Sequence, residues 1–221
     1  MRNFKIYAVA VLLIAPAVAI AQNENQRTSL VDGKSALNFE VNDDFDLTSF
    51  EGATVSLKHH YADNRAYRIS ISGMLSSQNS ENSTPVQGKS EVDYDRYSAS
   101  VFLQRLYYRS PLSTTTVFYG FGPRGGYNWQ KSTTSSPFNS TRTETVSDGW
   151  DIGLVALLGF EWFVRKEISL IAQYASSLRY VSRATEGKSG PDTNLVLTHS
   201  STDHSVQFDA DAVRVGVSLY W

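Results

Sequence analysis

Cysteine is absent from this 221-residue chain, which excludes disulfides, thiolate metal sites and a cysteine nucleophile. The chain also lacks an excess of positive or negative charge, since it has 20 lysines and arginines and 22 aspartates and glutamates. With a pI near 6.1, this balance argues against a general nucleic-acid binder. A mean hydropathy of −0.28 argues against a bundle of membrane helices. It does not exclude a membrane β-barrel, whose strands turn only every second residue toward lipid.

Long uncharged runs are missing except at the N-terminus. Arg2 and Lys5 come first, and the uncharged run Ile6–Ala21 follows, interrupted by Pro16 and ending in Ala19-Ile20-Ala21. The run is short for a membrane helix, which needs about 20 apolar residues. A positive start, a short apolar middle and a small-residue end predict a secretory signal peptide over residues 1–21, cleaved after Ala21.

Alternation with a period of two dominates the remaining chain and predicts β-strands. In Trp150–Phe163 the even positions are all apolar, whereas the odd positions mix glycine, aliphatic and acidic residues. The segment Tyr97–Arg109 is strand-like but ambiguous in phase, and a β-bulge is one explanation. The other predicted strands lie around residues 37–42, 54–61, 67–75, 114–129, 168–180 and 213–221. The fold class is therefore all-β, with eight strands.

Connector lengths indicate how these strands are joined. Short connectors at 62–64, 110–113 and 165–167 alternate with longer stretches rich in Ser, Thr, Asn, Asp and Gly at 43–52, 76–96, 131–147 and 181–203. Short turns on one rim and long loops on the other are typical of an antiparallel up-and-down barrel crossing an outer membrane. The predicted organisation is a signal peptide (1–21), an N-terminal lead segment (22–34) and a barrel (35–221).

Two features favour lipid outside the barrel rather than water. Small and charged residues share one face of the predicted strands, where glycines suit a crowded lumen better than a wetted surface. Aromatic residues gather near both ends of the strands, as expected for two membrane interfaces. The set near the short turns and the C-terminus is Tyr61, Tyr107, Tyr108, Phe160, Trp162, Phe163 and Trp221; the set toward the long loops is Tyr97, Tyr127, Trp129, Trp150 and Tyr180.

The chain ends in an aromatic residue preceded by apolar residues at alternate positions: Val213, Val215, Val217, Leu219 and Trp221. On this feature and the strand pattern, residues 35–221 resemble the small eight-stranded outer-membrane barrels of Gram-negative bacteria, the OmpA/OmpX-like group. The family's assembly signal usually ends in Phe, so Trp221 is a departure. The resemblance implies that the barrel-assembly machinery reads this C-terminal segment, and that the protein lies in the outer membrane.

An eight-stranded barrel has an interior just wide enough for side chains to fill. Charged residues on the inner face must be paired to be tolerated there. We therefore predict two ion-pair clusters that plug the lumen, with an ion or solute pathway through them as the alternative. The cluster in the periplasmic half comprises Glu40, Lys58, Arg68, Glu161 and Arg214, and the upper cluster comprises Arg124, Asp151 and Arg179.

An enzymatic function is the main alternative, because some of the eight-stranded outer-membrane barrels that this chain resembles modify lipid A. Histidines and serines meet in residues 199–205, where Asp203 or Asp209 could orient a histidine. A Ser/Thr-rich loop brings such residues together by chance, and the arrangement matches no known lipid A acyltransferase or deacylase. The adjacent His59 and His60 point to opposite faces of a strand and do not easily share a metal ion. No catalytic residue, metal site or cofactor is predicted.

The predicted function is non-enzymatic: a structural role in the envelope, or surface interaction through loops such as 76–93 and 131–147. The expected partners are outer-membrane lipids, the barrel-assembly machinery and an extracellular partner at the loops, with no nucleic acid and a monomeric barrel. A lipid A-modifying enzyme and a narrow pore are the alternatives.

Overall fold

A computed structural model describes Leu30 and residues 32–46, 51–84, 88–110, 113–136, 141–191, 195–210 and 213–221. The predicted signal peptide, and the lead segment apart from Leu30 and residues 32–34, lie outside the described residues. In those ranges no helix is long and apolar enough to cross a membrane.

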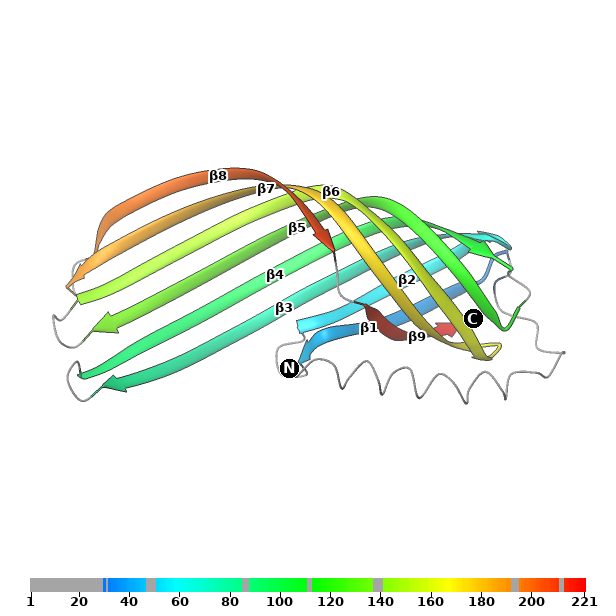
Figure 1. The fold of residues 1–221 in the computed structure, drawn as a ribbon, viewed down its shortest axis with the longest axis horizontal. Helices are drawn as coiled ribbons and strands as arrows, with labels where there is room; N and C mark the ends of the chain where they lie inside the picture. Colours follow the sequence, from blue (N-terminus) through cyan, green and yellow to red (C-terminus); the bar gives the residue numbers. More distant parts are fainter. Residues whose placement is uncertain are drawn as a thin grey trace.

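The described chain consists of β-strands joined by short connections (Figure 1). They are β1 (Ser35–Asp46), β2 (Glu51–Ala62), β3 (Arg65–Thr84), β4 (Gly88–Arg109), β5 (Thr115–Ser136), β6 (Thr141–Arg165), β7 (Ile168–Pro191), β8 (Val196–Ala210) and β9 (Arg214–Tyr220). Strands β1 to β7 each pair antiparallel with the next strand in sequence, as in an up-and-down barrel.

The last strand closes the ring. β9 pairs antiparallel with β1 from Ala36↔Tyr220 to Val41↔Val215, and with β7 from Ile168↔Leu219 to Gln173↔Arg214. β1 to β7 and β9 therefore form a ring of eight strands, which confirms the predicted fold class. β7 pairs with two strands in succession: its lower part pairs with β9 and its upper part pairs with β8. The sequence pattern did not predict this division of the last strand.

Three of the four stretches expected to be loops are mostly strand. The β3–β4 pairing continues in register to Thr84↔Gly88, β5–β6 to Ser136↔Thr141, and β7–β8 beyond Gly187↔His199 through a bulge. The prediction of loops was wrong because Ser and Thr are acceptable in strands, and both faces of a sheet are polar once it leaves the membrane. The fourth stretch, 43–52, holds the ends of β1 and β2 around residues 47–50, which are not described.

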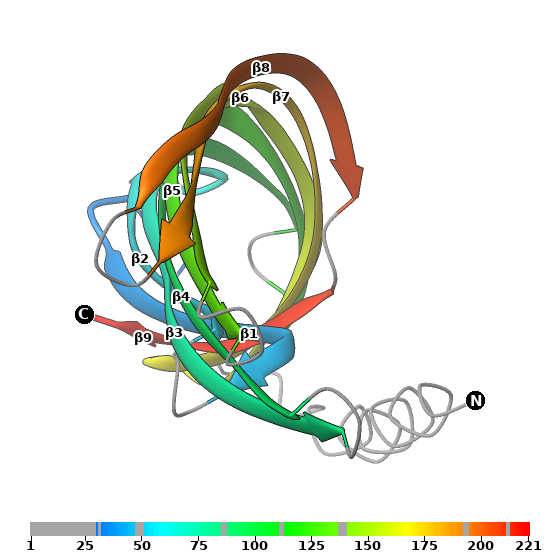
Figure 2. The ribbon, with the colours of Figure 1, turned by 90° about the vertical axis from the view of Figure 1, so that its left-hand side faces the viewer.

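Above the ring, the wall is an open curved sheet. The last β2–β3 partners are Ala53↔Gly73, so among the described strands the part of β3 above Gly73 pairs with β4 alone. β8 likewise pairs with β7 alone among the described strands. The six long strands β3 to β8 thus extend beyond the short β1, β2 and β9 and curve around an open side (Figures 1 and 2).

The phase of Tyr97–Arg109 is settled by burial and register. Phe102, Gln104, Leu106 and Tyr108 are buried inside, while residues of the opposite parity face outward. The pairing with β3 runs from Arg65↔Tyr107 to Thr84↔Gly88 without a shift, so no bulge is needed. The apparent ambiguity arose because this strand is apolar on both faces within the lower half of the barrel.

The outer surface of the ring is apolar and the inner surface holds the charges. Leu154 on the outer face of β6 is 64% exposed, whereas Glu161 on the inner face of the same strand is 0% exposed. Only a surrounding apolar solvent explains an exterior made of Leu, Ile, Val and aromatic side chains around buried ions. This geometry is that of a transmembrane β-barrel.

Aromatic side chains form two girdles around the outer face. The upper girdle includes the contacting pairs Tyr97–Trp129 and Trp150–Tyr180, with ring centroids 5.1 and 5.7 Å apart. The lower girdle includes Tyr61–Tyr67 at 4.6 Å and Tyr107–Tyr119 at 5.3 Å. Rings at these levels match the two headgroup regions of a bilayer.

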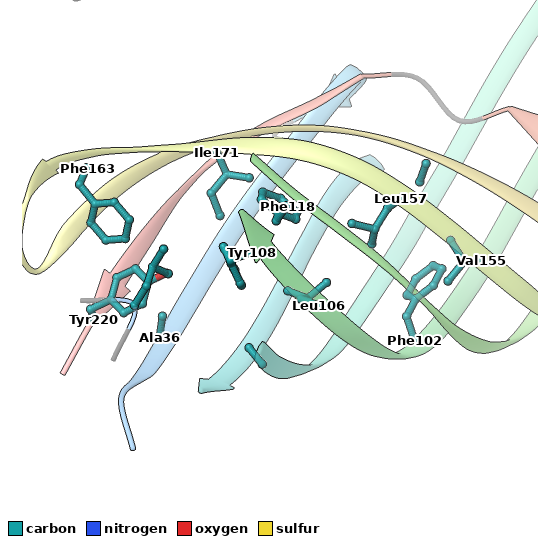
Figure 3. Close-up of a cluster of buried hydrophobic side chains, with 13 residues drawn as sticks. Ala36, Phe102, Leu106, Tyr108, Phe118, Val155, Leu157, Phe163, Ile171 and Tyr220 are labelled. Carbon is teal, nitrogen blue, oxygen red and sulfur yellow. The ribbon is translucent and has the colours of Figure 1, made fainter. Parts of the chain in front are cut away.

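Two aromatics assigned to the lower girdle lie inside instead. Tyr108 and Phe163 are buried, and their rings pack at 5.5 Å against Phe118 and at 5.3 Å against Tyr220, respectively (Figure 3). Their parity in β4 and β6 places them on the inner face, next to the short turns. The periplasmic end of the lumen is therefore closed by an apolar and aromatic cluster.

A charge on the lipid face should destabilise the barrel. Leu154 lies on the outer face of β6 between the two girdles. We expect Leu154→Arg to lower the free energy of unfolding by about 2–4 kcal/mol, the cost of an arginine near the bilayer midplane. Urea titration in phospholipid vesicles, followed by tryptophan fluorescence, measures the change. Leu154→Val is the control, and an arginine variant as stable as that control would contradict the lipid-facing assignment.

Candidate functional site in the barrel lumen

Alternation along each strand points one set of polar side chains at the barrel axis. The eight charged residues predicted to lie in the lumen all belong to this set, and five of them are buried there. Arg124, Arg179 and Arg214 are partly buried. Seven of the eight residues form three networks at successive depths, named lower, middle and upper below, where two clusters were predicted; Arg214 lies beside the middle one.

The lower network is built on a buried ion pair. Lys58 Nζ on β2 lies 2.9 Å from Glu161 Oε2 and 3.1 Å from Glu161 Oε1 on β6. The hydroxyls of Ser169 and Tyr220 also donate to Oε1, the latter at 2.7 Å. Because Glu161 is fully enclosed, these donors replace the water that its carboxylate loses.

Aromatic rings complete the surroundings of the lysine. The ammonium of Lys58 lies 4.7 Å from the ring centroid of Tyr220 and 5.5 Å from that of Tyr108. His60, which is buried, lies against the same two rings at 6.0 and 5.2 Å. This packing supplies cation–π attraction and excludes water from the ion pair.

The middle network joins four strands through one arginine. The guanidinium of Arg68 on β3 donates to Gln104 Oε1 at 2.7 Å, to Glu40 Oε1 at 3.2 Å and to Gln173 Oε1 at 2.9 Å. The amide of Gln173 in turn donates to Glu40 Oε2. Side chains from β1, β3, β4 and β7 therefore meet across the lumen and leave a cavity of only about 10 Å³ beside them.

One glycine makes room for this network. A Cβ on Gly216 of β9 would overlap the carbonyl oxygen of Phe39 and stand 2.8 Å from Glu40 Cγ. Glycine therefore lets the β1–β9 seam close while Glu40 bends inward toward Arg68. Gly216 therefore belongs to the seam that closes the ring and also makes room for the middle network.

The upper network is more open. The carboxylate of Asp151 lies 3.2 Å from Arg124 Nε and 3.6 Å from Arg179 Nη1. Arg179 Nε also lies 2.7 Å from Asp209 Oδ2 on β8. Arg124 Nη1 donates to Ser177 Oγ at 3.3 Å. This network connects β5, β6, β7 and β8 where the wall begins to open.

Arg214 lies beside the middle network, which holds Glu40 and Arg68 of the cluster in which it was predicted: it is the register partner of Gln173 and lines the same small cavity. Its Nη1 donates to Thr54 Oγ1 at 3.2 Å, and its guanidinium lies 5.8 Å from the ring centroid of Phe102. The guanidinium of Arg124 lies 5.1 Å from the same ring. The ring of Phe102 is therefore a shared contact of the two arginines inside the lumen.

Sequence reasoning did not single out several members of these networks. Gln104 stands in the strand whose phase was ambiguous, and Tyr220 lies between the last two residues of the alternating apolar series. Gln173 and Ser169 could have been found, because both share parity with Arg179 on β7. Neutral polar side chains carry no charge signal, so only their position on the inner face marks them.

The histidines and serines near residue 200 lie on a strand and not in a loop. On β8 they alternate between the two faces of the sheet, so His199 and His204 point opposite ways. The ring of His204 stacks on Tyr180 at 5.9 Å. Within the described residues no group of three His, Cys, Asp or Glu side chains could hold a metal ion.

The closed ring, the apolar exterior with two aromatic girdles and the ionic interior define this chain as a β-barrel protein of the bacterial outer membrane. No family model matches the sequence, and no curated protein matches it. Solved structures of outer-membrane proteins are similar to it in overall fold.

Three of these structures are crystal structures of bacterial proteins. A major outer membrane protein from Thermus thermophilus has a TM-score of 0.46 and 14% identity, with 86% of this chain and 99% of that chain covered. CarO2 of Acinetobacter baumannii has a TM-score of 0.44 and 15% identity, covering 86% and 99%. Ail, the attachment invasion locus protein of Yersinia pestis, has a TM-score of 0.35 and 13% identity, covering 86% and 100%.

Removing one partner of the lower ion pair should leave a buried, uncompensated charge. We expect Glu161→Gln to lower the free energy of unfolding by about 3–5 kcal/mol. The double variant Lys58→Met with Glu161→Gln should lose less free energy of unfolding than the two single variants lose together, because the two residues stabilise the barrel as a pair. Urea unfolding in vesicles measures these values.

The matched control is the ion pair between Lys131 and Glu144, which is 3.2 Å long and partly exposed on the extended sheet. We expect Glu144→Gln to change stability by no more than about 1 kcal/mol. If the two substitutions changed stability equally, the burial of the lower network would contribute nothing to the stability of the barrel.

Proposed function

We propose that this protein is a closed, non-enzymatic outer-membrane barrel whose extended sheet interacts with partners at the cell surface. The single observation that carries the proposal is the combination of a lumen filled by three polar networks with six strands that continue beyond the ring. The barrel anchors the chain in the membrane, and the sheet presents a rigid surface outside it.

The filled lumen argues against a narrow pore. The lower network is enclosed, with Lys58 and Glu161 at 1% and 0% exposure, and the middle network leaves only the small cavity described above. A conducting path would require these paired groups to separate, leaving charges without partners in a site with little water.

The geometry of the 199–205 segment argues against a lipid-modifying enzyme. His199 shares a face with Asp203, but in the described part of the chain the two are four residues apart along one strand and no hydrogen bond joins them. A general base needs a partner within hydrogen-bond reach of a nucleophile, and no Ser–His contact of that kind exists on the described strand β8.

The extended sheet supports a role in recognition. Along one edge, residues 74–78 of β3 have no second neighbour among the described strands, and β8 forms the other edge. Sheet edges are usually protected by charged residues, proline or bulges, and none of these occurs in residues 74–78 of β3. An extended peptide segment of a partner could add to either edge by backbone pairing.

Membrane insertion follows from the same proposal. The C-terminal residues Val213, Val215, Val217, Leu219 and Trp221 point outward on β9 and its flanks, where the barrel-assembly machinery would read them. β9 also closes the ring against β1, so the segment that carries the assembly signal is also the seam of a monomeric barrel.

Conductance tests the closed lumen. We expect the purified full-length protein to give no discrete current steps in planar bilayers, because the enclosed networks block the axis. A porin with a water-filled channel, prepared in the same detergent, is the positive control. Reproducible unitary steps from this protein would overturn the closed-barrel proposal in favour of the pore.

A shortened sheet tests the surface role. The three long hairpins are cut back to the registered pairs Ser77↔Asp95, Lys131↔Val146 and Arg183↔Asp203, each closed with an Asn-Gly turn. In a deletion strain we expect this variant to restore resistance to detergent as the full chain does. Only the full chain should promote cell–cell adhesion, measured by sedimentation. Equal adhesion by both forms, or a changed lipid A acyl pattern in the strain, would contradict the proposal.

A further inference from the structure

The upper lumen contains a polar cavity of about 260 Å³ above the networks that close the barrel. Its walls come from β4 to β8, and serine, asparagine and glutamine side chains alternate there with arginines. A volume below the roughly 300–1,000 Å³ of sites for drug-sized ligands leaves room for one small polar group and little more.

The charges around this cavity are unequal. Four arginines line it, Arg96, Arg124, Arg179 and Arg183, together with a single carboxylate from Asp151. Asp151 already lies within 3.6 Å of two of those arginines, so its charge is compensated inside the wall. The cavity therefore has a net positive charge.

Two of the arginines are available to a ligand. Arg96 on β4 and Arg183 on β7 are exposed and form no ion pair with any residue in the described ranges. Asp203 stands opposite Arg183 in the β7–β8 register, but it does not line the cavity and forms no ion pair with Arg183. Exposed guanidinium groups that line the same cavity from different strands favour a shared anion.

Two glycines allow close packing of the wall beside the upper network. A Cβ on Gly126 would stand 3.0 Å from Ser100 Oγ and 3.1 Å from Asp151 Cγ. A Cβ on Gly149 would stand 2.8 Å from the carbonyl oxygen of Ser182 and 3.3 Å from Asn128 Nδ2. The missing side chain of Gly126 lets Asp151 lie against the wall, with its carboxylate turned to the arginines.

The cavity can be reached from outside but not from the periplasm. Ser98 and Ser100 also line a second polar cavity of about 180 Å³ beside Ser72 and Met74, where β3 leaves its pairing with β2. Below, the middle and lower networks close the axis. A ligand would therefore enter from the cell surface or through the open side between β3 and β8.

We propose that this cavity is a binding site for a phosphomonoester, held by Arg96 and Arg183 above the Asp151 network. A guanidinium offers paired N–H donors that match the oxygens of a phosphate, and a dianion is best shared by more than one arginine. The phosphate could belong to a soluble sugar phosphate or to a lipopolysaccharide of the outer leaflet. The cavity recognises the same group in both cases.

Calorimetric titration of the full-length protein in detergent micelles with glucose 6-phosphate tests the site. We expect saturable binding that weakens with salt, and no binding of glucose. Arg96→Ala and Arg183→Ala should each weaken binding by about ten-fold, and Asp203→Asn should strengthen it. Arg142→Ala is the matched control, because Arg142 lies in the same extended sheet but does not line the cavity.

A second titration distinguishes the two sources of phosphate. Protein in nanodiscs is mixed with lipid A that is either phosphorylated or enzymatically dephosphorylated. Binding of the phosphorylated form alone, lost in Arg96→Ala and Arg183→Ala, would support the site with a lipid ligand even without binding of glucose 6-phosphate. If neither probe binds, or if binding is unchanged in both arginine variants, the proposal is overturned.

Discussion

The closure of the backbone hydrogen-bond ring is the constraint on which this structure depends. Inside a bilayer an unpaired strand edge has no water to satisfy it, so a membrane sheet must meet itself. Here the β1–β9 pairing does this over a short segment, from Ala36↔Tyr220 to Val41↔Val215. Gly216 lies in that seam, and its missing side chain leaves space for Glu40. The wall and the middle network are consequently coupled at one position.

Closing a ring of eight strands sets the character of the interior. The interior combines an apolar and aromatic cluster near the short turns with buried charged side chains, and these charges have to neutralise one another because little water surrounds them. Lys58 and Glu161, which are 103 residues apart, do so across the lumen, and Arg68 and Glu40 do so between β3 and β1 on either side of β2. Each pair joins two strands that are not neighbours in the ring, and so holds the wall in one shape.

Where the chain leaves the membrane, the requirement for closure disappears. Water can hydrogen-bond to a free edge, and β1, β2 and β9 stop while β3 to β8 continue as an open sheet (Figure 2). The same transition leaves the upper network partly exposed, with Arg179 bridging Asp151 and Asp209 at the opening. The surface sheet and the arginine-lined cavity are both consequences of ending the ring early.

The sequence by itself determined the class of fold and the facing of most strands, because alternation such as that of Trp150–Phe163 reports directly which side each residue meets. It also marked charged residues like Glu161 as inward. Only the tertiary structure decided which charges pair, how β8 and β9 share β7 as a neighbour, and that stretches such as 76–96 are mostly strand. The physical reason is that partners across a lumen are set by register and strand tilt, which are long-range quantities. A polar hairpin above the membrane, moreover, has no alternation to reveal it.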